Sequence, residues 1–124
     1  MSKTPLMEAC IYCETEKAKD LIEGGADLHV KCKDGLTALM YVSGNGAEEI
    51  VKLLIDQGVD VNVKSNPYED TALLYAASNG YKNIVELLLK ANANPNIQNI
   101  DGESPMSQAE YNGHTEVVDL LSYY

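Results

Sequence analysis

Short apolar runs recur along the chain at a nearly constant spacing, and a hydroxyl residue precedes each of them. The hydroxyl residues are Thr4, Thr37, Thr71 and Ser104, which lie 33, 34 and 33 residues apart. The segments that begin there read TPLMEAC, TALMYVS, TALLYAA and SPMSQAE. A period in the low thirties is the signature of a repeat array, in which each unit packs on its neighbours. Such an array is expected to present an extended surface rather than a reaction centre.

The first half of each repeat predicts a short helix. It begins at the hydroxyl residue, whose oxygen can accept a backbone N–H of the opening turn. Pro5 and Pro105 come next, at a position where a missing N–H costs nothing. Small and apolar residues then recur at helical spacing: Leu39, Val42 and Ser43 in one repeat, Leu73, Ala76 and Ala77 in the next. Gly46, Gly80 and Gly113, each preceded by Asn, are placed to end these helices.

The second half of each repeat predicts another helix, with a denser apolar stripe. In the two middle repeats the stripe consists of Ile50, Val51, Leu53 and Leu54, and of Ile84, Val85, Leu87 and Leu88. We expect Leu54 and Leu88 to be buried between helices. The helices should stop at Gly25, Gly58 and Asn92, because Gly and Asn tolerate a left-handed backbone. A polar turn then closes each repeat.

Together these motifs resemble the ankyrin repeat, whose fingerprint is a T-P-L-H-x-A opening followed by two helices and a projecting β-turn. The resemblance covers essentially the whole chain, residues 3–124. It implies one all-α domain over residues 1–124, a solenoid of stacked helix-turn-helix units with finger-like turns. The repeats would span approximately 1–33, 34–66, 67–100 and 101–124.

The chain departs from the family pattern in two places. The His of the fingerprint is replaced by Met7, Met40, Leu74 and Ser107. Its side-chain hydrogen bond to the Thr is therefore absent, and packing must substitute for it. The finger at residues 66–70 has one residue more than the others and lacks the usual Gly, so we expect its turn to be distorted.

The end repeats carry polar residues where the middle repeats are apolar. Lys17 and Asp20 replace the Ile and Leu of the second-helix stripe in the first repeat. In the last repeat, Ser107 and Glu110 take the corresponding places on the first helix. Solenoid ends need a polar outer face, because no neighbour covers them. The pattern therefore favours a complete, self-capped array rather than a fragment.

The balance of charge narrows the choice of partner. The sequence has 9 basic and 19 acidic side chains, for a net charge of −10. This charge repels phosphate backbones and anionic lipid, so neither nucleic acid nor a membrane is an expected partner, whereas a basic protein is. No apolar run reaches the length of a membrane span, the N-terminus lacks a signal-peptide layout, and the cysteines are odd in number. We therefore expect a cytoplasmic protein, and a monomer without a cofactor.

One set of residues suggests a different class of function, a zinc or redox site. Cys10, Cys13, His29 and Cys32 have the pairwise spacing of a four-ligand zinc site. The repeat register argues against it, because the first pair lies on a first helix and the second pair in a finger turn. That places the pairs on the order of 15–25 Å apart, whereas zinc ligands lie about 2.0–2.3 Å from the metal. We regard zinc or redox chemistry as the alternative hypothesis.

Other catalytic patterns are weaker. His114 begins a second helix in the Gly-His arrangement of the family, which predicts a structural role, and His29 is expected to be a turn residue. The sequence contains neither a nucleophile motif between strand and helix nor a phosphate-binding Gly-rich loop. We therefore predict that the protein is not an enzyme.

The resemblance implies that a protein partner binds to the finger tips and to the exposed side of the first helices, which form the concave face. Mapped by register, the candidate partner-binding residues are Tyr12, Leu36, Tyr41, Asn45, Tyr68, Tyr75, Asn79, Ile100, Tyr111 and Asn112. Tyr is enriched at interface hot spots, because it combines large contact area with little entropy to lose. Tyr41 and Tyr75 could instead only pack between neighbouring first helices, and a scaffold that merely self-associates is a third interpretation.

Overall fold

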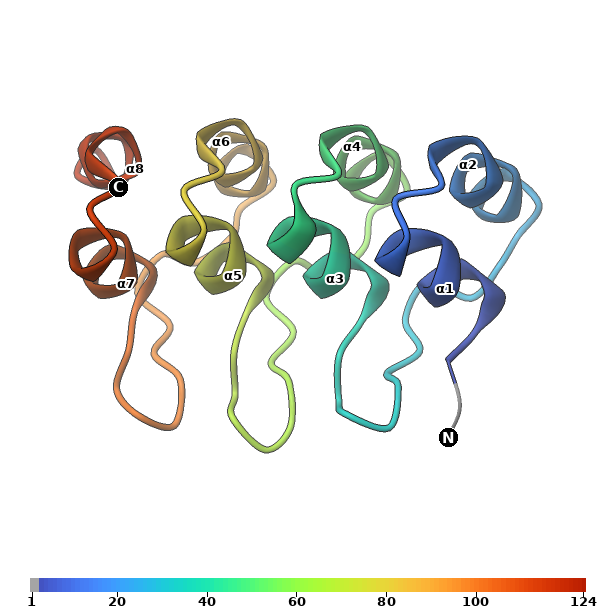
Figure 1. The fold of residues 1–124 in the computed structure, drawn as a ribbon, viewed down its shortest axis with the longest axis horizontal. Helices are drawn as coiled ribbons and strands as arrows, with labels where there is room; N and C mark the ends of the chain where they lie inside the picture. Colours follow the sequence, from blue (N-terminus) through green and yellow to red (C-terminus); the bar gives the residue numbers. More distant parts are fainter. Residues whose placement is uncertain (1–2) are drawn as a thin grey trace.

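The computed structural model describes residues 3–124, which form eight α-helices and no β-strand. In chain order the helices are α1 (Pro5–Ile11), α2 (Thr15–Glu23), α3 (Ala38–Asn45), α4 (Glu48–Asp56), α5 (Ala72–Ser78), α6 (Lys82–Lys90), α7 (Pro105–Tyr111) and α8 (Thr115–Leu121). Consecutive helices contact each other in four pairs, and the pairs stand in one row (Figure 1). The predicted all-α array of helix-turn-helix units is confirmed.

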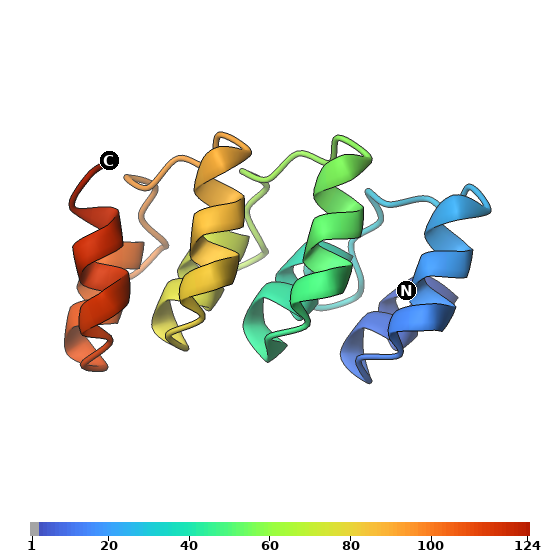
Figure 2. The same ribbon diagram turned by 90° about the horizontal axis from the view of Figure 1, so that it is seen from above.

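The row has two helical layers with loops projecting from one of them. Helices α1, α3, α5 and α7 form one layer, and α2, α4, α6 and α8 form the other (Figure 1). Within each layer every helix contacts the next along the row, as the view from above shows for the second layer (Figure 2). The connections between repeats leave the first layer as long loops, the fingers. This arrangement buries each apolar stripe against a neighbouring repeat.

The hydroxyl residues cap the first helices as predicted. The side chains of Thr4, Thr37, Thr71 and Ser104 each accept the backbone N–H three residues ahead, at distances of 3.1 to 3.3 Å. The missing His of the family pattern is compensated in two ways. Met7, Met40 and Leu74 are buried, so packing holds this position in the first three repeats. In the last repeat the Ser107 hydroxyl accepts the Ser104 backbone N–H at 2.9 Å and completes a capping box.

The predicted helix ends also adopt the expected backbone. Gly46, Gly80 and Gly113 have φ values of 83°, 76° and 76°, in the left-handed region. Cys13 holds the equivalent position in the first repeat with a φ of 55°. Asn92 ends the third repeat's second helix with a φ of 72°. The register inferred from the sequence is therefore correct at each of these turns.

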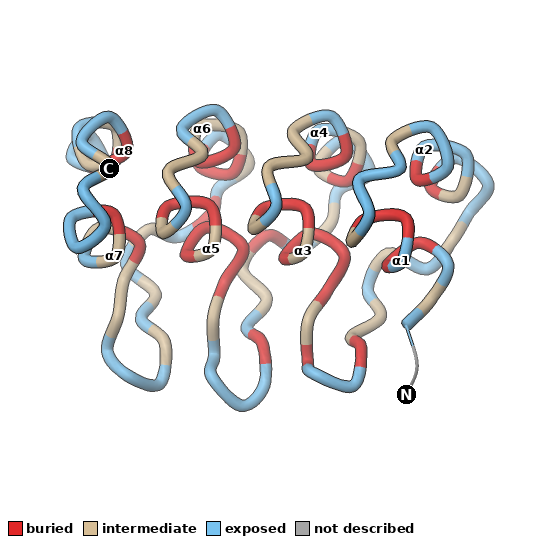
Figure 3. Tube along the Cα trace, in the orientation of Figure 1, coloured by how far each residue is buried: buried red, intermediate tan, exposed pale blue. Residues whose placement is uncertain are grey.

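The core runs between the two layers and between repeats (Figure 3). Leu54 and Leu88 are fully buried in it, as predicted, together with Ile50, Ile84 and the valines that follow them. Leu53 and Leu87 differ from the rest of the predicted stripe, because they are only half-buried. They pack against the margin of the core rather than inside it.

Three fingers project from the first layer, at residues 31–36, 64–70 and 98–103, and their tips are exposed (Figure 3). A backbone hydrogen bond closes fingers one and three between residues four apart: Cys32 N–H to the Leu36 carbonyl and Asn99 N–H to the Glu103 carbonyl, each 2.9 Å. Finger two closes one residue later, from Ser65 N–H to the Asp70 carbonyl. The expected distortion is thus a longer loop, which places Glu69 at a φ of 60°.

The fingers also touch one another. The Lys31 ammonium donates to the Lys64 carbonyl at 2.9 Å, and Ile100 N–H donates to the Tyr68 carbonyl at 2.9 Å. Gly35 lies against finger two so closely that a Cβ there would stand 2.6 Å from the Asn66 nitrogen. Only glycine fits this contact, and its φ of 76° favours glycine as well. The fingers are therefore a connected set.

The ends of the row expose the polar residues that replace apolar ones. Lys17 and Asp20 on α2 are exposed, as are Ser107 and Glu110 on α7. These side chains let both terminal repeats face water without an apolar patch at these positions. None of the helices within residues 3–124 combines the length and the apolar character needed to cross a membrane.

Candidate partner-binding surface

The predicted partner-binding residues all lie on one face of the row. We call it the finger face: the side formed by α1, α3, α5, α7 and the three fingers. Tyr41 and Tyr75 are on α3 and α5. Four residues stand at or next to the C-terminal ends of the first helices: Tyr12, Asn45, Asn79 and Asn112. Tyr111 is the last residue of α7, and Leu36, Tyr68 and Ile100 lie on the fingers.

The aromatic residues of this face are not equally exposed. Tyr12 and Tyr111, in the end repeats, have 73% and 86% of their surface accessible. Tyr68 and Ile100 on the fingers are 61% accessible. Tyr41 and Tyr75 are only half-buried, and so is Leu36, one of the predicted partner-binding residues. Leu36 is shielded because it packs against the core at the base of finger one.

The Tyr41 side chain is fixed at the base of finger one. Its hydroxyl lies 3.1 Å from the Sγ atom of Cys32. Burial first, and then the Cys32 thiol, raise the pKa of Tyr41 above its ordinary value. Burial alone would raise the pKa of Cys32 too. Hydrogen bonds from Tyr41 and from the backbone of Leu36 and Asp34 outweigh it, so the pKa of Cys32 is lowered.

Tyr75 is fixed in a similar way at finger two. Its hydroxyl donates to Oδ2 of Asp70 at 3.1 Å, and the side chain of Asn99 donates to Oδ1 at 2.9 Å. Burial, and then the Asp70 charge, raise the pKa of Tyr75 to about 12, so the phenol stays neutral. The two central tyrosines therefore present their rings in orientations fixed by hydrogen bonds at their far ends.

The asparagines of the finger face link neighbouring repeats. The Asn45 amide donates to the Cys10 carbonyl, Asn79 to the Gly44 carbonyl and Asn112 to the Ser78 carbonyl, each at 2.9 Å. Each bond satisfies a carbonyl near the end of the preceding first helix, where intrahelical partners run out. This structural role was not foreseen from the sequence, because the carbonyl belongs to the adjacent repeat.

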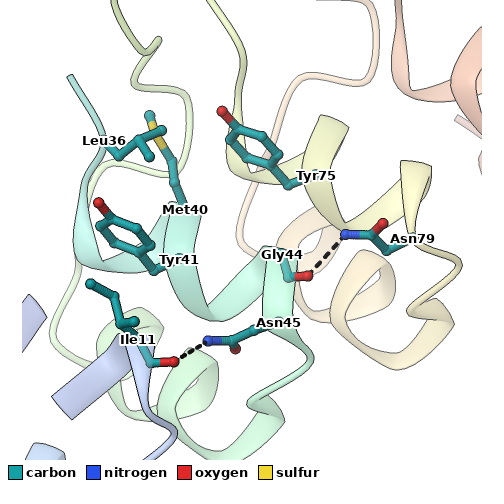
Figure 4. Close-up of a pocket in the computed structure, with 8 residues that line it drawn as sticks. All are labelled: Ile11, Leu36, Met40, Tyr41, Gly44, Asn45, Tyr75 and Asn79. Carbon is teal, nitrogen blue, oxygen red and sulfur yellow. Dashed lines mark hydrogen bonds between the residues drawn. The ribbon is translucent and has the colours of Figure 1, made fainter. Parts of the chain in front are cut away.

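A pocket opens between the two central tyrosines (Figure 4). Its volume is about 340 Å³, within the range of ligand-binding pockets. The lining residues come from the first three repeats: Ile11, Leu36, Met40, Tyr41, Gly44, Asn45, Tyr75 and Asn79. Most of this lining is apolar or aromatic. The structure thus brings five of the ten predicted residues around one pocket: Leu36, Tyr41, Asn45, Tyr75 and Asn79.

Gly44 makes this pocket possible, and its role was missed from the sequence. The register places Ile11, Ser78 and Tyr111 at the same position of the other first helices. Only the second repeat has no side chain there, and a Cβ at Gly44 would stand 3.7 Å from the Cβ of Tyr75. A glycine within the predicted helix, where the other repeats carry larger residues, was the available signal.

A second hollow continues the pocket toward the fingers. It has a volume of about 440 Å³ and shares Leu36 and Tyr75 with the pocket. Its other walls are Lys33 and Asp34 of finger one, and Ser65, Asn66, Pro67 and Tyr68 of finger two. The finger face therefore carries an apolar pocket that leads into a polar gap between two fingers.

The residues of the alternative zinc or redox site do not come together. Within residues 3–124 no group of three or more His, Cys, Asp or Glu side chains is placed to hold a metal ion. All three cysteines are free thiols, with Cys10 and Cys32 buried and Cys13 exposed. Burial, and then the neighbouring Cys13, raise the pKa of Cys10 to about 12, which keeps this thiol protonated. The geometry gives the alternative hypothesis no support.

The two histidines occupy structural positions. His114 Nε2 lies 2.9 Å from the Ser78 carbonyl, and its ring covers Gly80, where a Cβ would stand 2.5 Å from the ring. His29 is exposed in a turn, and its backbone N–H donates to Asp27. Neither histidine lines the pocket between the tyrosines.

Comparison with known proteins places the repeats in a family. Residues 6–99 match a family model of ankyrin repeats in three copies. Human "Ankyrin repeat and KH domain-containing protein 1" is 36% identical over 64 residues, which are 52% of this chain and 2% of that protein. "Ankyrin repeat and SAM domain-containing protein 6" of Rattus norvegicus is 38% identical over 63 residues, 50% of this chain and 7% of that protein.

The matched region of this chain thus spans only a small part of either relative. Ankyrin repeats are generally protein–protein interaction modules, and the family is typically non-enzymatic. The match covers most of residues 3–124 and includes both central repeats with their pocket. The chain therefore belongs to the ankyrin-repeat family.

Proposed function

We propose that this protein is a non-enzymatic module that binds a partner protein on its finger face. The observation that carries the proposal is the pocket between Tyr41 and Tyr75. Both rings are fixed in place by hydrogen bonds before any partner arrives. Preorganised side chains lose little entropy on binding. Contacts with them therefore contribute more to affinity than contacts with side chains that must first become ordered.

The other predicted residues have different parts in this proposal. Tyr12, Tyr68, Ile100 and Tyr111 offer exposed apolar surface along the face. Leu36 forms a wall shared by the pocket and the finger gap. Asn45, Asn79 and Asn112 hold the first helices in register and thereby set the shape of the surface. Anchors at the centre and weaker contacts around them are the usual anatomy of an interface.

The net charge of −10 favours a basic protein as the partner and disfavours nucleic acid and anionic lipid. We further propose that the protein acts as a monomer in the cytoplasm. Light scattering of the purified protein tests the monomeric state. Association with a basic partner should slow as salt rises, because charge steering is screened over about 8–10 Å at physiological ionic strength.

The direct test compares two double variants in partner capture followed by a binding titration. Tyr41→Ala with Tyr75→Ala should weaken binding by more than about 2 kcal/mol, because aromatic anchors dominate interfaces. Lys52→Ala with Glu86→Ala changes α4 and α6 in the opposite layer and should alter binding by well under that. Circular dichroism must show that both variants remain folded. Equal losses from the two faces, or no loss from either, would mean that the partner docks elsewhere.

A further inference from the structure

The pocket between Tyr41 and Tyr75 has no cationic side chain in its lining. None of its lining residues is Lys, Arg or His. Four of them have side chains with a donor, and each of the four is already hydrogen-bonded or in contact with an acceptor inside the protein: Tyr41, Asn45, Tyr75 and Asn79. An anionic group entering the pocket would find no positive charge. The lining therefore disfavours acidic side chains of a partner.

Negative charge lies beside this pocket, on its finger side. The Asp70 carboxylate lies 3.1 Å from the Tyr75 hydroxyl, and Asp34 lines the finger gap that shares Tyr75 with the pocket. The ion pairs found within residues 3–124 involve neither aspartate. Asp70 accepts two hydrogen bonds, and a carboxylate has about four lone-pair positions. The Asp70 carboxylate therefore has no ion-pair partner among these residues, and it can still accept further hydrogen bonds.

One side chain matches an apolar pocket, or slot, that has aromatic walls and a carboxylate hydrogen-bonded to one of those walls. We propose, on the basis of the function proposed above, that the slot between Tyr41 and Tyr75 receives an arginine of the partner protein. The arginine stem would lie against Ile11, Leu36 and Met40. Its planar guanidinium would stack on the tyrosine rings and donate to Asp70.

Arginine fits this slot better than lysine or an aliphatic residue. The guanidinium is planar and more weakly hydrated than an ammonium, so it loses less on entering an aromatic slot. An aliphatic side chain would fill the apolar part of the slot but would make no electrostatic interaction with the Asp70 carboxylate. Lys33 also lines the finger gap. Its ammonium would repel a second basic side chain of the partner in the finger gap, so the proposal is limited to one arginine.

The test uses four blocked tripeptides with the ¹⁵N-labelled full chain. The peptides are N-acetyl-Gly-X-Gly-amide with arginine, citrulline, leucine or glutamate at X. Citrulline has the shape of arginine without its charge. The arginine peptide should shift the amide signals of Gly44 and Tyr75 and bind in about the millimolar range, as its few contacting atoms allow. Citrulline should bind about fivefold more weakly, and glutamate should leave both signals unchanged.

Four variants locate the response. Gly44→Leu fills the slot and should abolish the signal shifts caused by the arginine peptide. Gly44→Ala serves if the larger residue disturbs the fold, since its Cβ would stand 3.7 Å from the Tyr75 Cβ, an ordinary contact. Asp70→Asn keeps an acceptor for Tyr75 and removes the charge, so arginine should then bind only as well as citrulline. Glu49→Gln removes an exposed charge from α4 in the other layer and should change nothing.

The outcomes separate this inference from the proposed function. The arginine proposal is overturned if the leucine peptide binds as tightly as the arginine peptide. It is also overturned if the shifted amide signals belong to residues away from the slot, or if no peptide shifts the signals of Gly44 and Tyr75. The proposed function then still stands or falls on the Tyr41 and Tyr75 double variant against the partner. If the arginine peptide binds in the slot but the Tyr41 and Tyr75 double variant binds the partner as tightly as the parent protein, the slot recognises arginine and the proposed docking face is wrong.

Discussion

The central and terminal repeats carry tyrosines on the same face but use them differently. Tyr41 and Tyr75 are half-buried, and contacts with the base of a finger fix both hydroxyls. Tyr12 and Tyr111 are 73% and 86% exposed. The difference follows from register. The central pair faces the fingers, whereas the terminal pair stands at the helix ends. The same residue type thus builds a rigid pocket in one place and leaves a solvated side chain in another.

The largest expected difference between these regions concerns the core. Leu54 in the second repeat is fully buried, whereas Leu21, its equivalent in the first repeat, is half-buried. Leu54→Ala should lower the free energy of unfolding by roughly 2–5 kcal/mol, because it leaves a cavity. Leu21→Ala should cost less, because part of that side chain is already in water. Urea unfolding of both variants measures this, and a cost at Leu21 equal to that at Leu54 would contradict the comparison.

Leu54 also marks how far the sequence alone could lead. Its burial was predicted, as were the caps at Thr37 and Thr71, because a helix period and a hydroxyl in front of it are local signals. The left-handed ends at Gly46 and Asn92 follow from the residue type alone.

The details of the site depend on neighbouring repeats, which no local pattern describes. The Asn79 amide bonds to a carbonyl 35 positions away in sequence. The half-burial of Leu36 depends on how the base of its finger packs against the core. The pocket brings together Tyr41 of α3 and Tyr75 of α5, and Gly44 of α3 lies beside Tyr75. The sequence indicated which face carries large side chains, but their contacts depend on the exact stacking of the repeats.

A smaller effect is expected at the central tyrosine hydroxyls. Tyr75→Phe removes the donor to Asp70 and should lower the free energy of unfolding by about 1–2 kcal/mol, because the acceptor is charged and half-buried. Tyr111→Phe should change it by less than about 0.5 kcal/mol, as surface substitutions usually do. Thermal or urea unfolding of the two variants provides the measurement. Equal effects would show that the Tyr75 hydroxyl does not contribute to fixing its ring.

The pocket floor offers a substitution that separates stability from binding. Gly44 is helical without a left-handed backbone, and an added Cβ would meet Tyr75 at an ordinary distance of 3.7 Å. Gly44→Ala should therefore raise the free energy of unfolding by roughly 0.5–1 kcal/mol, because alanine favours the helix. It should weaken partner binding nonetheless, because the methyl group narrows the slot.

Gly46→Ala is the matched control for that substitution, two residues along the same segment. Gly46 has a φ of 83°, and a Cβ there would stand 3.1 Å from the Tyr81 ring. This variant should lose stability, in contrast to Gly44→Ala. Destabilisation by both substitutions would mean that Gly44 is retained for the fold rather than for the pocket.

The smallest expected effect concerns a bridge that the first repeat lacks. Asn62 joins the second repeat to the third: its amide donates to the Asn92 carbonyl at 3.2 Å, and its Oδ1 accepts the Asn94 N–H at 2.7 Å. The register places His29 at the same position of the first repeat, in the same turn closed by an Asp side chain. Gly58 and Asp60 take the places of Asn92 and Asn94 there.

His29→Asn should create the equivalent bridge and raise the free energy of unfolding by about 0.5 kcal/mol, the lower end for a hydrogen bond in an exposed turn. Asn62→Ala should lower it by at least as much, because it removes a bridge that exists. Urea unfolding of both variants, with hydrogen exchange at Asp60 as a local readout, provides the measurement. A gain in stability without slower exchange at Asp60 would mean that the substitution acts elsewhere, and that the terminal repeat is less tightly joined for another reason.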